Sequence, residues 1–463
     1  MSPIGQFKSV YLIGIGGIGM SALARYFISR GLPVGGFDKT PSELVRCLQE
    51  EGAQVHFQES VSLIPEVFLS PETTLVIYTP AISREHQELR YFFDNGFQVL
   101  KRAEVLGLLT RSSKGLCVAG THGKTTTSTM IAHILSESHV QCNAFLGGIS
   151  KNVGSNLILS AQSPYTVIEA DEYDRSFHQL RPFISVITAT DADHLDIYGT
   201  YEAYLESFQH YTSLIAPEGC LIVHAGLDLV PKVQDGVSIF TYSKDEGDFR
   251  AGNIRIGKGR IVFDFIHPEG TIKDIELGVP VLVNIENGIA AMAVARMAGA
   301  SDEEIRSAML SFQGVERRFD FLSRDEHSAL LLDYAHHPME IRSSARSLRA
   351  LYPTERLTAI FQPHLYTRTR DFYKDFASSL SLFDEVFLTE IYPAREQPIE
   401  GVTSQLILDN MDATVSRHLC LKKDVTEVVR SQATGSVIVL LGAGDIDRMA
   451  EEILNAFKQK RNE

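Results

Sequence analysis

The sequence predicts an α/β protein with three domains and mostly parallel sheets. Short apolar runs, typical of buried strands, alternate with longer helix-compatible segments through most of the 463 residues, which is the pattern of repeated strand–helix–strand units. A chain of this length does not form a single hydrophobic core. We expect Rossmann-like N-terminal (1–111) and C-terminal (317–463) domains, and a central phosphate-loop ATPase-like domain (112–316) that includes a small antiparallel hairpin.

The first domain opens with a glycine-rich turn between a strand, expected over residues 8–13, and a helix that ends near Arg30. The turn reads Gly14-Ile15-Gly16-Gly17-Ile18-Gly19-Met20-Ser21. Glycines at this spacing allow backbone N–H groups and a helix N-terminus to approach a diphosphate. The motif therefore indicates a diphosphate site without saying whose diphosphate it is. A tight turn without a ligand is the simpler alternative.

Two further features extend this expected site. A second strand, over residues 32–37, ends at Asp38, where dinucleotide-binding folds place an acidic residue against a ribose. A strand over residues 74–78 runs into the loop from Thr79 to Ser83, at the sheet edge where ligands bind in such folds. Taken alone, these features favour an NAD-dependent dehydrogenase.

The second domain is organised around Gly120-Thr121-His122-Gly123-Lys124-Thr125-Thr126. A buried strand over residues 115–119 precedes this run, and a helix over residues 124–136 follows it. In a phosphate-binding loop, backbone N–H groups surround an anion, a lysine reaches the terminal phosphates and a hydroxyl binds Mg²⁺. The loop is shorter than the general pattern, because Val118 stands where the first glycine would be. A capped helix start is the alternative, but a cap needs one hydroxyl and not three.

Acidic residues end the next two strands of this domain. A strand over residues 165–169 leads into Glu169-Ala170-Asp171-Glu172, and a strand over residues 184–188 is followed by Asp191, Asp193 and His194. Carboxylates beside a phosphate loop are ligands that Mg²⁺ prefers. Together with Thr125, these groups could hold two cations around an ATP γ-phosphate. An acidic surface turn is the alternative.

The rest of the second domain carries weaker signals. Residues 250–275 alternate like a small antiparallel hairpin. Asn284-Ile285-Glu286-Asn287-Gly288 then opens an alanine-rich helix over residues 289–298. Its asparagines either cap that helix or contact a base, and the sequence does not decide between the two.

In the third domain, which begins near Arg317-Arg318-Phe319-Asp320, three buried strands end in polar or glycine turns. The turns are Asp333-Tyr334-Ala335-His336-His337-Pro338, Gln362-Pro363-His364-Leu365-Tyr366-Thr367-Arg368-Thr369-Arg370 and Gly442-Ala443-Gly444-Asp445. Carboxyl ends of parallel strands share one edge, so these turns should face a common cleft. His336 and His337, directly before a helix-starting proline, favour a functional role. Arg368 and Arg370 are candidates for carboxylate or phosphate recognition.

Composition and charge exclude several classes of protein. The net charge of −15 argues against nucleic-acid binding. No apolar run approaches the roughly 20 residues of a membrane span, and residues 1–30 lack the pattern of a secretory leader. The five cysteines show no paired spacing, which indicates a reducing compartment and hence a cytoplasmic protein.

Together, these motifs resemble the Mur ligase family of peptidoglycan synthesis over the whole chain. The resemblance rests on the two glycine-rich turns, on Glu169 to Glu172, on Asp193-His194, on Arg317 to Asp320 and on His336-His337-Pro338. It implies a bacterial, ATP-dependent ligase that joins L-alanine to the lactyl carboxylate of UDP-N-acetylmuramate through an acyl phosphate, releasing ADP and phosphate. It also implies ATP and two Mg²⁺ ions as cofactors. We expect a monomer or a weak homodimer.

The resemblance also implies a role for each matching residue. For UDP-N-acetylmuramate, these are Gly14, Gly16, Gly17, Ile18, Gly19, Met20 and Ser21 at the diphosphate, with Asp38, Thr79 and Ser83 near the uridine end. For ATP, they are Gly120, Thr121, His122, Gly123, Lys124, Thr125 and Thr126, with Asn287 near the adenine, and Arg318 and Asp333 from the third domain. Mg²⁺ would be held by Thr125, Glu169 and His194. The amino-acid pocket would involve His337, His364 and Arg368. The expected catalytic residues are Lys124, Glu169, His194, His337 and Arg368.

The sequence departs from the family pattern in three places. Gln209 stands near the distance at which several family members carry a carbamylated lysine, so we expect the second metal ion to be held without it. Leu365 replaces an arginine, which shifts the expected binding of the alanine carboxylate to Arg368. Val283 replaces a histidine before Asn284. A recycling ligase that accepts a preformed peptide and a non-catalytic nucleotide-binding regulator remain as alternatives to the L-alanine ligase.

Overall fold

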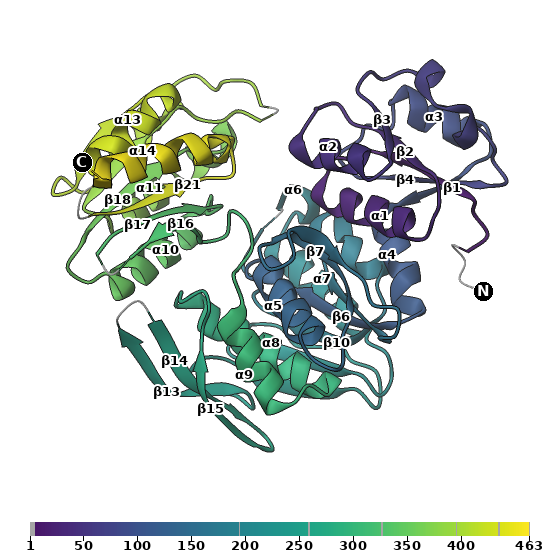
Figure 1. Cartoon of the computed structure of the whole chain (residues 1–463), viewed down its shortest axis with the longest axis horizontal. Coiled ribbons are helices and arrows are strands. Elements are labelled where there is room, and N and C mark those ends of the chain that lie inside the picture. Colours follow the sequence, from purple (N-terminus) through teal and green to yellow (C-terminus); the bar gives the residue numbers. More distant parts are fainter. Residues whose placement is uncertain are drawn as a thin grey trace. The chain divides into compact units, whose positions relative to one another are not determined.

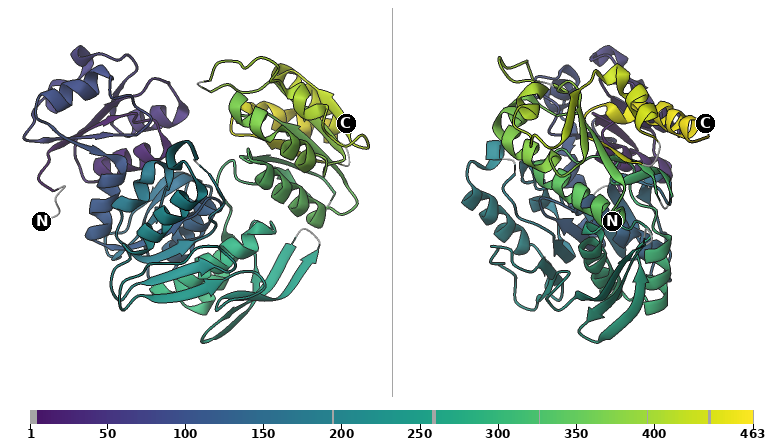
Figure 2. Two further views of the ribbon diagram at one scale, coloured as in Figure 1. Left: turned by 180° about the vertical axis from the view of Figure 1, so that it is seen from behind. Right: turned by 90° about the vertical axis from the view of Figure 1, so that its left-hand side faces the viewer.

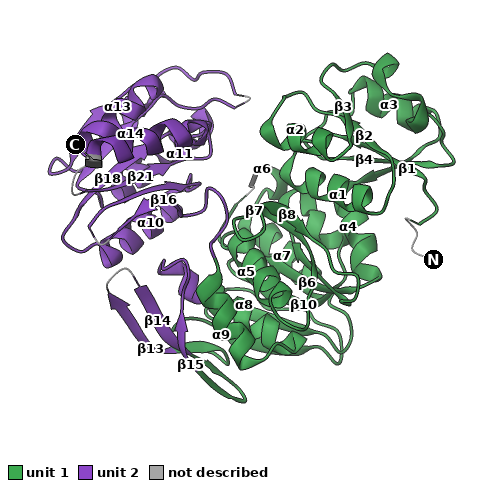
Figure 3. Cartoon of the chain, in the orientation of Figure 1, with its two compact units in different colours: residues 1–251, 265–272, 287–312 green, residues 252–264, 273–286, 313–463 purple. Residues whose placement is uncertain are grey.

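The described residues form an α/β fold with four sheets, and the α/β class is the one that the sequence predicts. The structure, a computed structural model, describes residues 5–193, 195–257, 260–325, 327–394, 396–433 and 436–462, and Figure 1 and Figure 2 show its helices and strands. The chain divides into two compact units (Figure 3). One contains residues 1–251, 265–272 and 287–312, and the other contains residues 252–264, 273–286 and 313–463. The predicted boundaries at 111/112 and 316/317 stay a prediction.

The first sheet is parallel throughout and has the order β3-β2-β1-β4-β5. Its strands are β1 (Ser9–Ile13), β2 (Val34–Phe37), β3 (Gln54–His56), β4 (Thr74–Tyr78) and β5 (Gln98–Lys101). Its helices are α1 (Ile18–Ser29), α2 (Glu43–Glu50), α3 (Gln87–Asp94) and α4 (Arg102–Arg111). The chain leaves β1 toward β2 and later returns to the other side of β1 as β4. This reversal places the turn after β1 and the loop after β4 at a switch point, where such sheets bind ligands.

The second sheet has seven strands in the order β12-β11-β10-β6-β9-β7-β8, of which only the β7–β8 pair is antiparallel. The strands are β6 (Lys114–Ala119), β7 (Asn143–Ser150), β8 (Ser155–Ile158), β9 (Tyr165–Glu169), β10 (Pro182–Ile187), β11 (Cys220–His224) and β12 (Ser238–Tyr242). Its helices are α5 (Lys124–Ser136), α6 (Leu195–Tyr198), α7 (Tyr201–Thr212), α8 (Val283–Ala298) and α9 (Asp302–Ser311), with the 3₁₀ segment η3 (Tyr173–Gln179). Because β6 lies between β9 and β10, the phosphate loop has an acid-rich strand end on each side.

The first two sheets share one continuous hydrophobic core, which runs from β1 and α1 to β9, β10 and α7. A buried amide fixes the contact between them. Asn156 on β8 donates to the hydroxyl of Ser21 at 2.9 Å and accepts from the guanidinium of Arg25 at 2.6 Å. Burying an amide is costly unless its hydrogen bonds are satisfied, so this network specifies how α1 lies on β8.

A small sheet, β13-β14-β15, contributes residues to both units. Its strands are β13 (Arg250–Gly257), β14 (Arg260–His267) and β15 (Gly270–Glu276). The connections between consecutive strands are too short for a parallel crossover, so the sheet is antiparallel, as predicted. The helix that follows begins at Val283, so the prediction of a helix over residues 289–298 placed its start too late. Asn284 and Asn287 lie inside that helix and do not precede it.

The C-terminal sheet has the order β16-β17-β21-β18-β19-β20, with only β16 antiparallel to its neighbour. Its strands are β16 (Asp320–Arg324), β17 (Ala329–Asp333), β18 (Arg356–Phe361), β19 (Glu385–Leu388), β20 (Ser416–Leu419) and β21 (Ser436–Leu441). Helix α11 (Tyr366–Leu380) packs against α10 (Pro338–Leu351) and against α12 (Ser404–Leu408). Helix α13 (Val425–Gln432) packs against α14 (Ala450–Asn462). β21 lies between β17 and β18, so the three predicted strand ends are neighbours.

All five cysteines are free thiols. In the part of the chain that the structure describes, no helix is both long and apolar enough to cross a membrane.

Candidate active site

The phosphate loop connects the centre of the seven-stranded sheet to helix α5. Gly123 caps the helix with a φ of +79°, and Gly120 has a φ of +131°. Side chains other than glycine rarely adopt such angles. A Cβ atom at Gly120 would also collide with the hydroxyl of Thr188, which follows β10 and donates hydrogen bonds to the carbonyls of Ala119 and His122. The end of β10 therefore holds the loop, and this contact leaves no room for a side chain.

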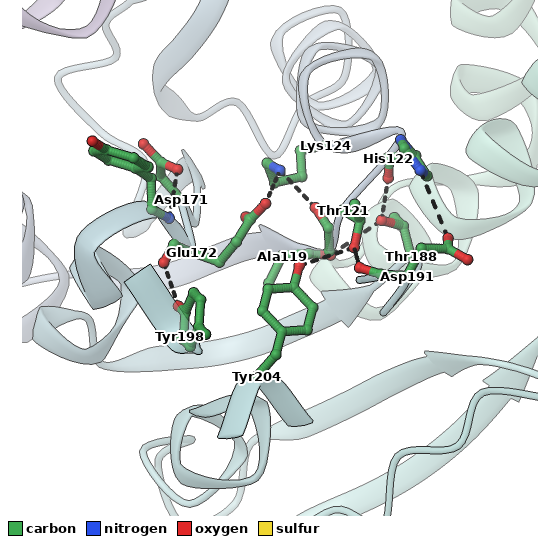
Figure 4. A network of polar contacts seen from close by, with 12 residues as sticks. Ala119, Thr121, His122, Lys124, Asp171, Glu172, Thr188, Asp191, Tyr198 and Tyr204 are labelled. Atoms are coloured by element: carbon green, nitrogen blue, oxygen red, sulfur yellow. Dashed lines mark hydrogen bonds and ion pairs between the residues drawn. The ribbon is translucent and has the colours of Figure 1, made fainter. Parts of the chain in front are cut away.

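Lys124, the first residue of α5, turns its ammonium back over the loop (Figure 4). Its Nζ atom donates to the carbonyl oxygen of Gly120 at 2.6 Å and to Oε1 of Glu172 at 2.8 Å. Burial by itself would lower the pKa of Lys124, but the nearby carboxylates of Glu172, Glu169 and Asp171 outweigh it and raise that pKa above its usual value. The lysine is therefore a half-buried cation held at the loop.

The other side chains of the loop have partners on neighbouring elements. The hydroxyl of Thr121 donates to the carbonyl of Asp191 at 2.8 Å and lies 2.9 Å from the hydroxyl of Tyr204 (Figure 4). The ring of His122 lies 3.7 Å from the carboxylate of Asp191. Thr125 is buried and Thr126 is half-buried. The turn is thus braced by the segment after β10 and by helix α7.

Oxygen ligands suited to Mg²⁺ stand beside this loop. Glu169 ends β9, and its Oε2 atom is buried without a hydrogen-bond partner among the described residues. An unpartnered buried carboxylate oxygen fits a site completed by a cation. Within the described ranges, no group of three or more His, Cys, Asp and Glu side chains could hold a metal ion by itself. The predicted ligand His194 lies outside the described residues.

Asn287 packs against the phosphate loop from helix α8. Its Oδ1 atom accepts a hydrogen bond from the hydroxyl of Thr127 at 3.2 Å, and it would lie 2.8 Å from a Cβ atom placed at Gly123. The side chain is buried. Asn287 therefore holds the loop against α8, and its predicted contact with a base stays a prediction.

The glycine turn after β1 is held by the residues predicted near the uridine end. Asp38 accepts a hydrogen bond from the backbone N–H of Gly16 at 2.8 Å, so its carboxylate points at the turn. Thr79 lies against Gly14, where a Cβ atom would meet its methyl group at 2.9 Å. Ser83 is exposed, and its hydroxyl accepts from the N–H of Glu85. The structure thus brings Asp38 and Thr79 to the turn, whereas Ser83 braces its own loop.

Arg102 is a candidate that the sequence reasoning missed. It begins helix α4, and a Cβ atom at Gly19 would collide with its guanidinium. It also donates to Asp171 at 3.1 Å. A cavity of about 140 Å³ has Gly19 and Arg102 on its wall together with Glu169 and Asp171. The signal available in the sequence was that Arg102 directly follows the end of a strand, where ligands bind in such sheets. The sequence did not show which loops that strand end would face.

The three predicted strand ends of the C-terminal sheet do meet. The N–H of Gly442 donates to the carbonyl of Asp333 at 3.1 Å, and the amide of Gln362 donates to Asp445 at 3.0 Å. The rings of His336 and His364 are 6.3 Å apart. The expectation of one shared edge is confirmed, and its residues lie within a single compact unit.

Two arginines and a carboxylate gather at one end of this edge. The guanidinium groups of Arg317 and Arg318 lie 4.7 Å and 4.8 Å from the ring centre of Tyr334. Asp333 accepts hydrogen bonds from the hydroxyl of Ser344 and the N–H of Phe319. Burial raises the pKa of Asp333 to about 6, because it outweighs the opposing hydrogen bond from Ser344 and charge of Arg318. The structure therefore brings Arg318 and Asp333 together, and their contact with ATP stays a prediction.

At the other end, His364 and Arg368 lie together, with 3.5 Å between His364 Nδ1 and Arg368 Nη1. Leu365, between them in sequence, has a φ of +73°, which is strained for a branched residue. The histidine ring that lies near His364 is that of His336. His337 instead caps helix α10 and packs its ring on Phe372. Arg370 is exposed and pairs with Asp371.

The fold and these sites define an α/β protein with two glycine turns of the phosphate-binding kind and a third polar sheet edge. Three family models match it: the Mur ligase family, catalytic domain, over residues 9–114; the Mur ligase middle domain, over 118–295; and the Mur ligase, glutamate ligase domain, over 317–444. The chain belongs to the Mur ligase family.

Several relatives and solved structures are similar over nearly the whole chain. A UDP-N-acetylmuramate–L-alanine ligase of Phocaeicola vulgatus is 61% identical over 99% of this chain and 100% of its own length. One of Porphyromonas gingivalis is 52% identical over 96% and 97%. The crystal structure of UDP-N-acetylmuramate–alanine ligase MurC from Thermotoga maritima is 25% identical, covers 97% and 99%, and has a TM-score of 0.82. A murein peptide ligase of Psychrobacter arcticus, 22% identical with a TM-score of 0.66 over 97% and 98%, shares the fold.

The raised pKa of Asp333 predicts a pH-dependent contribution to stability. The folded protein keeps a proton that the unfolded chain releases, so the contribution is fully present below about pH 4 and is lost as the pH rises through about 6. With about 1.4 kcal/mol for each pH unit, the free energy of unfolding of wild type relative to Asp333→Asn should rise by about 3 kcal/mol on acidification over this range. Denaturant unfolding of both proteins between pH 4 and pH 7 measures it, and a constant difference would contradict the prediction.

Proposed function

We propose that this protein is an ATP-dependent ligase that forms an amide between L-alanine and the lactyl carboxylate of UDP-N-acetylmuramate. Two relatives that carry this name match 99% and 96% of the chain at 61% and 52% identity. The structural observation that supports the proposal is the cavity of about 140 Å³ that has Gly19 of the diphosphate turn and the metal-site candidate Glu169 on one wall. A sugar nucleotide held at Gly19 would extend toward the phosphate loop.

The reaction requires activation of a poor electrophile. Transfer of the ATP γ-phosphate to a carboxylate oxygen gives an acyl phosphate and ADP. The amine of L-alanine then attacks the carbonyl carbon, forming the C–N bond and losing a proton. Collapse of the tetrahedral intermediate breaks the C–O bond and releases phosphate. The protein supplies little covalent chemistry, so its tasks are positioning the reactants and neutralising charge.

The central domain would perform the ATP part of this work. The loop from Gly120 to Thr126 would surround the phosphates, and Lys124 would neutralise the terminal ones. Thr125 and Glu169 would hold Mg²⁺, which would screen the charge of the phosphates when bound. We propose His194 for a second ion and Asn287 for the adenine, both from the family resemblance.

The N-terminal and C-terminal domains would hold the other reactants. We propose that the turn from Gly14 to Ser21 binds the diphosphate, and that Arg102 binds the muramyl carboxylate, because its guanidinium lies over Gly19 and lines the same cavity as Glu169. In the C-terminal domain we assign His364 and Arg368 to L-alanine, and Arg318 and Asp333 to ATP. The role of His337 as a catalytic residue stays a prediction.

The alternatives differ in what they need. A dehydrogenase does not need a phosphate loop whose lysine is held beside acid-rich strand ends. A non-catalytic regulator would not need to retain Lys124 and Glu169 together beside the loop. A recycling ligase that accepts a peptide differs only in its acceptor, and the acceptor must be tested directly. Five free thiols fit a reducing compartment, and we propose a cytoplasmic location.

Phosphate release in the presence of Mg²⁺, ATP and UDP-N-acetylmuramate tests the function, with single amino acids or a preformed peptide that has a free N-terminal amine added as acceptor. We expect release that depends on both the sugar nucleotide and L-alanine. Release with the peptide but not with L-alanine would show that the protein is the recycling ligase and not the L-alanine ligase. Tight nucleotide binding without release under any condition would favour the regulator.

Replacing the loop lysine tests the division between the two sites. Lys124→Ala should lower kcat by at least about a hundredfold, because transition-state charge on the phosphates loses its neutralising group. UDP-N-acetylmuramate binding should stay within about threefold of wild type in titration calorimetry, because the diphosphate turn lies on a different sheet. Loss of that binding in a folded variant would contradict the division.

Replacing Arg102 tests its proposed contact with the substrate carboxylate. Arg102→Met should lower kcat/KM for UDP-N-acetylmuramate by about 10- to 100-fold, the size expected for a lost charge-assisted hydrogen bond, while the KM for ATP changes little. Lys101→Met is the matched control, since Lys101 pairs with Asp174 at the surface. An equal effect of both variants would reject a specific role for Arg102.

A further inference from the structure

Glu172 is a buried carboxylate that has no role in the proposed reaction so far. It follows Glu169 by three positions and is 1% exposed. Its Oε1 atom accepts the hydrogen bond from Lys124 at 2.8 Å, while its Oε2 atom is buried and has no hydrogen-bond partner among the described residues. A carboxylate is costly to bury unless a cation and hydrogen bonds compensate. Glu172 is therefore placed for contact with the loop lysine.

The backbone of Glu172 is fixed independently of that lysine. Its carbonyl oxygen accepts from the N–H of Arg175 at 3.0 Å and from the hydroxyl of Tyr198 at the end of α6 (Figure 4). Asp174 and Arg175, which follow, have φ angles of +53° and +54°, a conformation that costs energy outside glycine. A strained turn that clamps one carbonyl between two donors holds the side chain of Glu172 over the loop.

The contacts of Lys124 show what this position of Glu172 does to the ammonium group. An ammonium group has three donors. One is taken by the carbonyl of Gly120 and one by Glu172, and this leaves a single donor for an anion in the loop. Because two donors are held by groups of two different loops, the chain sets where Nζ lies and which direction remains for a phosphate.

We propose that Glu172 is a positioning residue that orients the ammonium of Lys124 toward the transferred phosphate. The proposal rests on the proposed function, in which Lys124 neutralises that phosphate. The carboxylate also balances the charge of a half-buried cation in the nucleotide-free protein, so the loop is formed before ATP binds. Glu172 itself does not touch the reacting atoms.

Two substitutions separate orientation from charge. Glu172→Ala removes the acceptor and should lower kcat at least about tenfold, while ADP binds no more weakly than it does to wild type, because the negative charge that faces the phosphates is also removed. Glu172→Gln keeps an oxygen within reach of Nζ and should recover most of kcat. It should also bind ADP about three- to tenfold more tightly, because a negative charge facing the phosphates is gone. Asp174→Asn is the matched control, since it removes a charge two positions away, and asparagine tolerates the positive φ there.

Calorimetric titration with ADP and the phosphate-release assay give the two readouts for each variant. A folded Glu172→Ala protein with wild-type kcat, or a Glu172→Gln protein as slow as Glu172→Ala, would overturn the proposal. Parallel losses of kcat and ADP affinity in all variants, the control included, would show a structural role only. Absence of acceptor-dependent release in wild type would count against the proposed function, and the ADP affinities would still test Glu172.

Discussion

The parallel order of the seven-stranded sheet is the constraint on which the nucleotide site depends. β6 is flanked by β9 and β10 in the same direction, so all three carboxyl ends lie at one edge. The phosphate loop follows the first strand, Glu169 to Glu172 follow the second, and Thr188 follows the third. No residue of this group is near the others in sequence except within its own loop. The sheet alone brings a lysine, its carboxylates and the hydroxyl that braces the turn into contact.

The same geometry is repeated in the other two large sheets. In the first, the reversal of strand order at β1 brings the glycine turn against Thr79 after β4. In the C-terminal sheet, β21 joins the strand ends of β17 and β18, so Asp333, Gln362 and Gly442 become neighbours. The protein thus presents three polar edges of one kind, and the side chains at each edge set its chemistry.

Positively charged side chains lie at these sheet edges, although the chain as a whole has a negative net charge. A protein of net charge −15 holds Arg102 and the loop lysine beside glycine turns and carboxylates, where partial burial strengthens each electrostatic contact. Arg102 and Lys124 each pair with an acid of the segment after β9. Those pairs leave the cations charged and fixed, which is what the recognition of phosphates and carboxylates requires. Global charge is therefore a poor guide to the ligands of this protein.

The sequence by itself determined the motifs and the positions of many strands and helices. The strand at 74–78 and the helix at 124–136 have the predicted bounds, because burial pattern, glycine turns and helix starts are local properties. Tertiary structure decided the partners. It turned Asp38 toward Gly16, placed Arg102 over Gly19, and selected His336 to approach His364. It also paired Lys124 with Glu172. In the sequence, Glu172 was only one of three acidic residues after the strand at 165–169. Each of these contacts joins residues that are distant in sequence or on different loops, and only the order and direction of the strands bring them together.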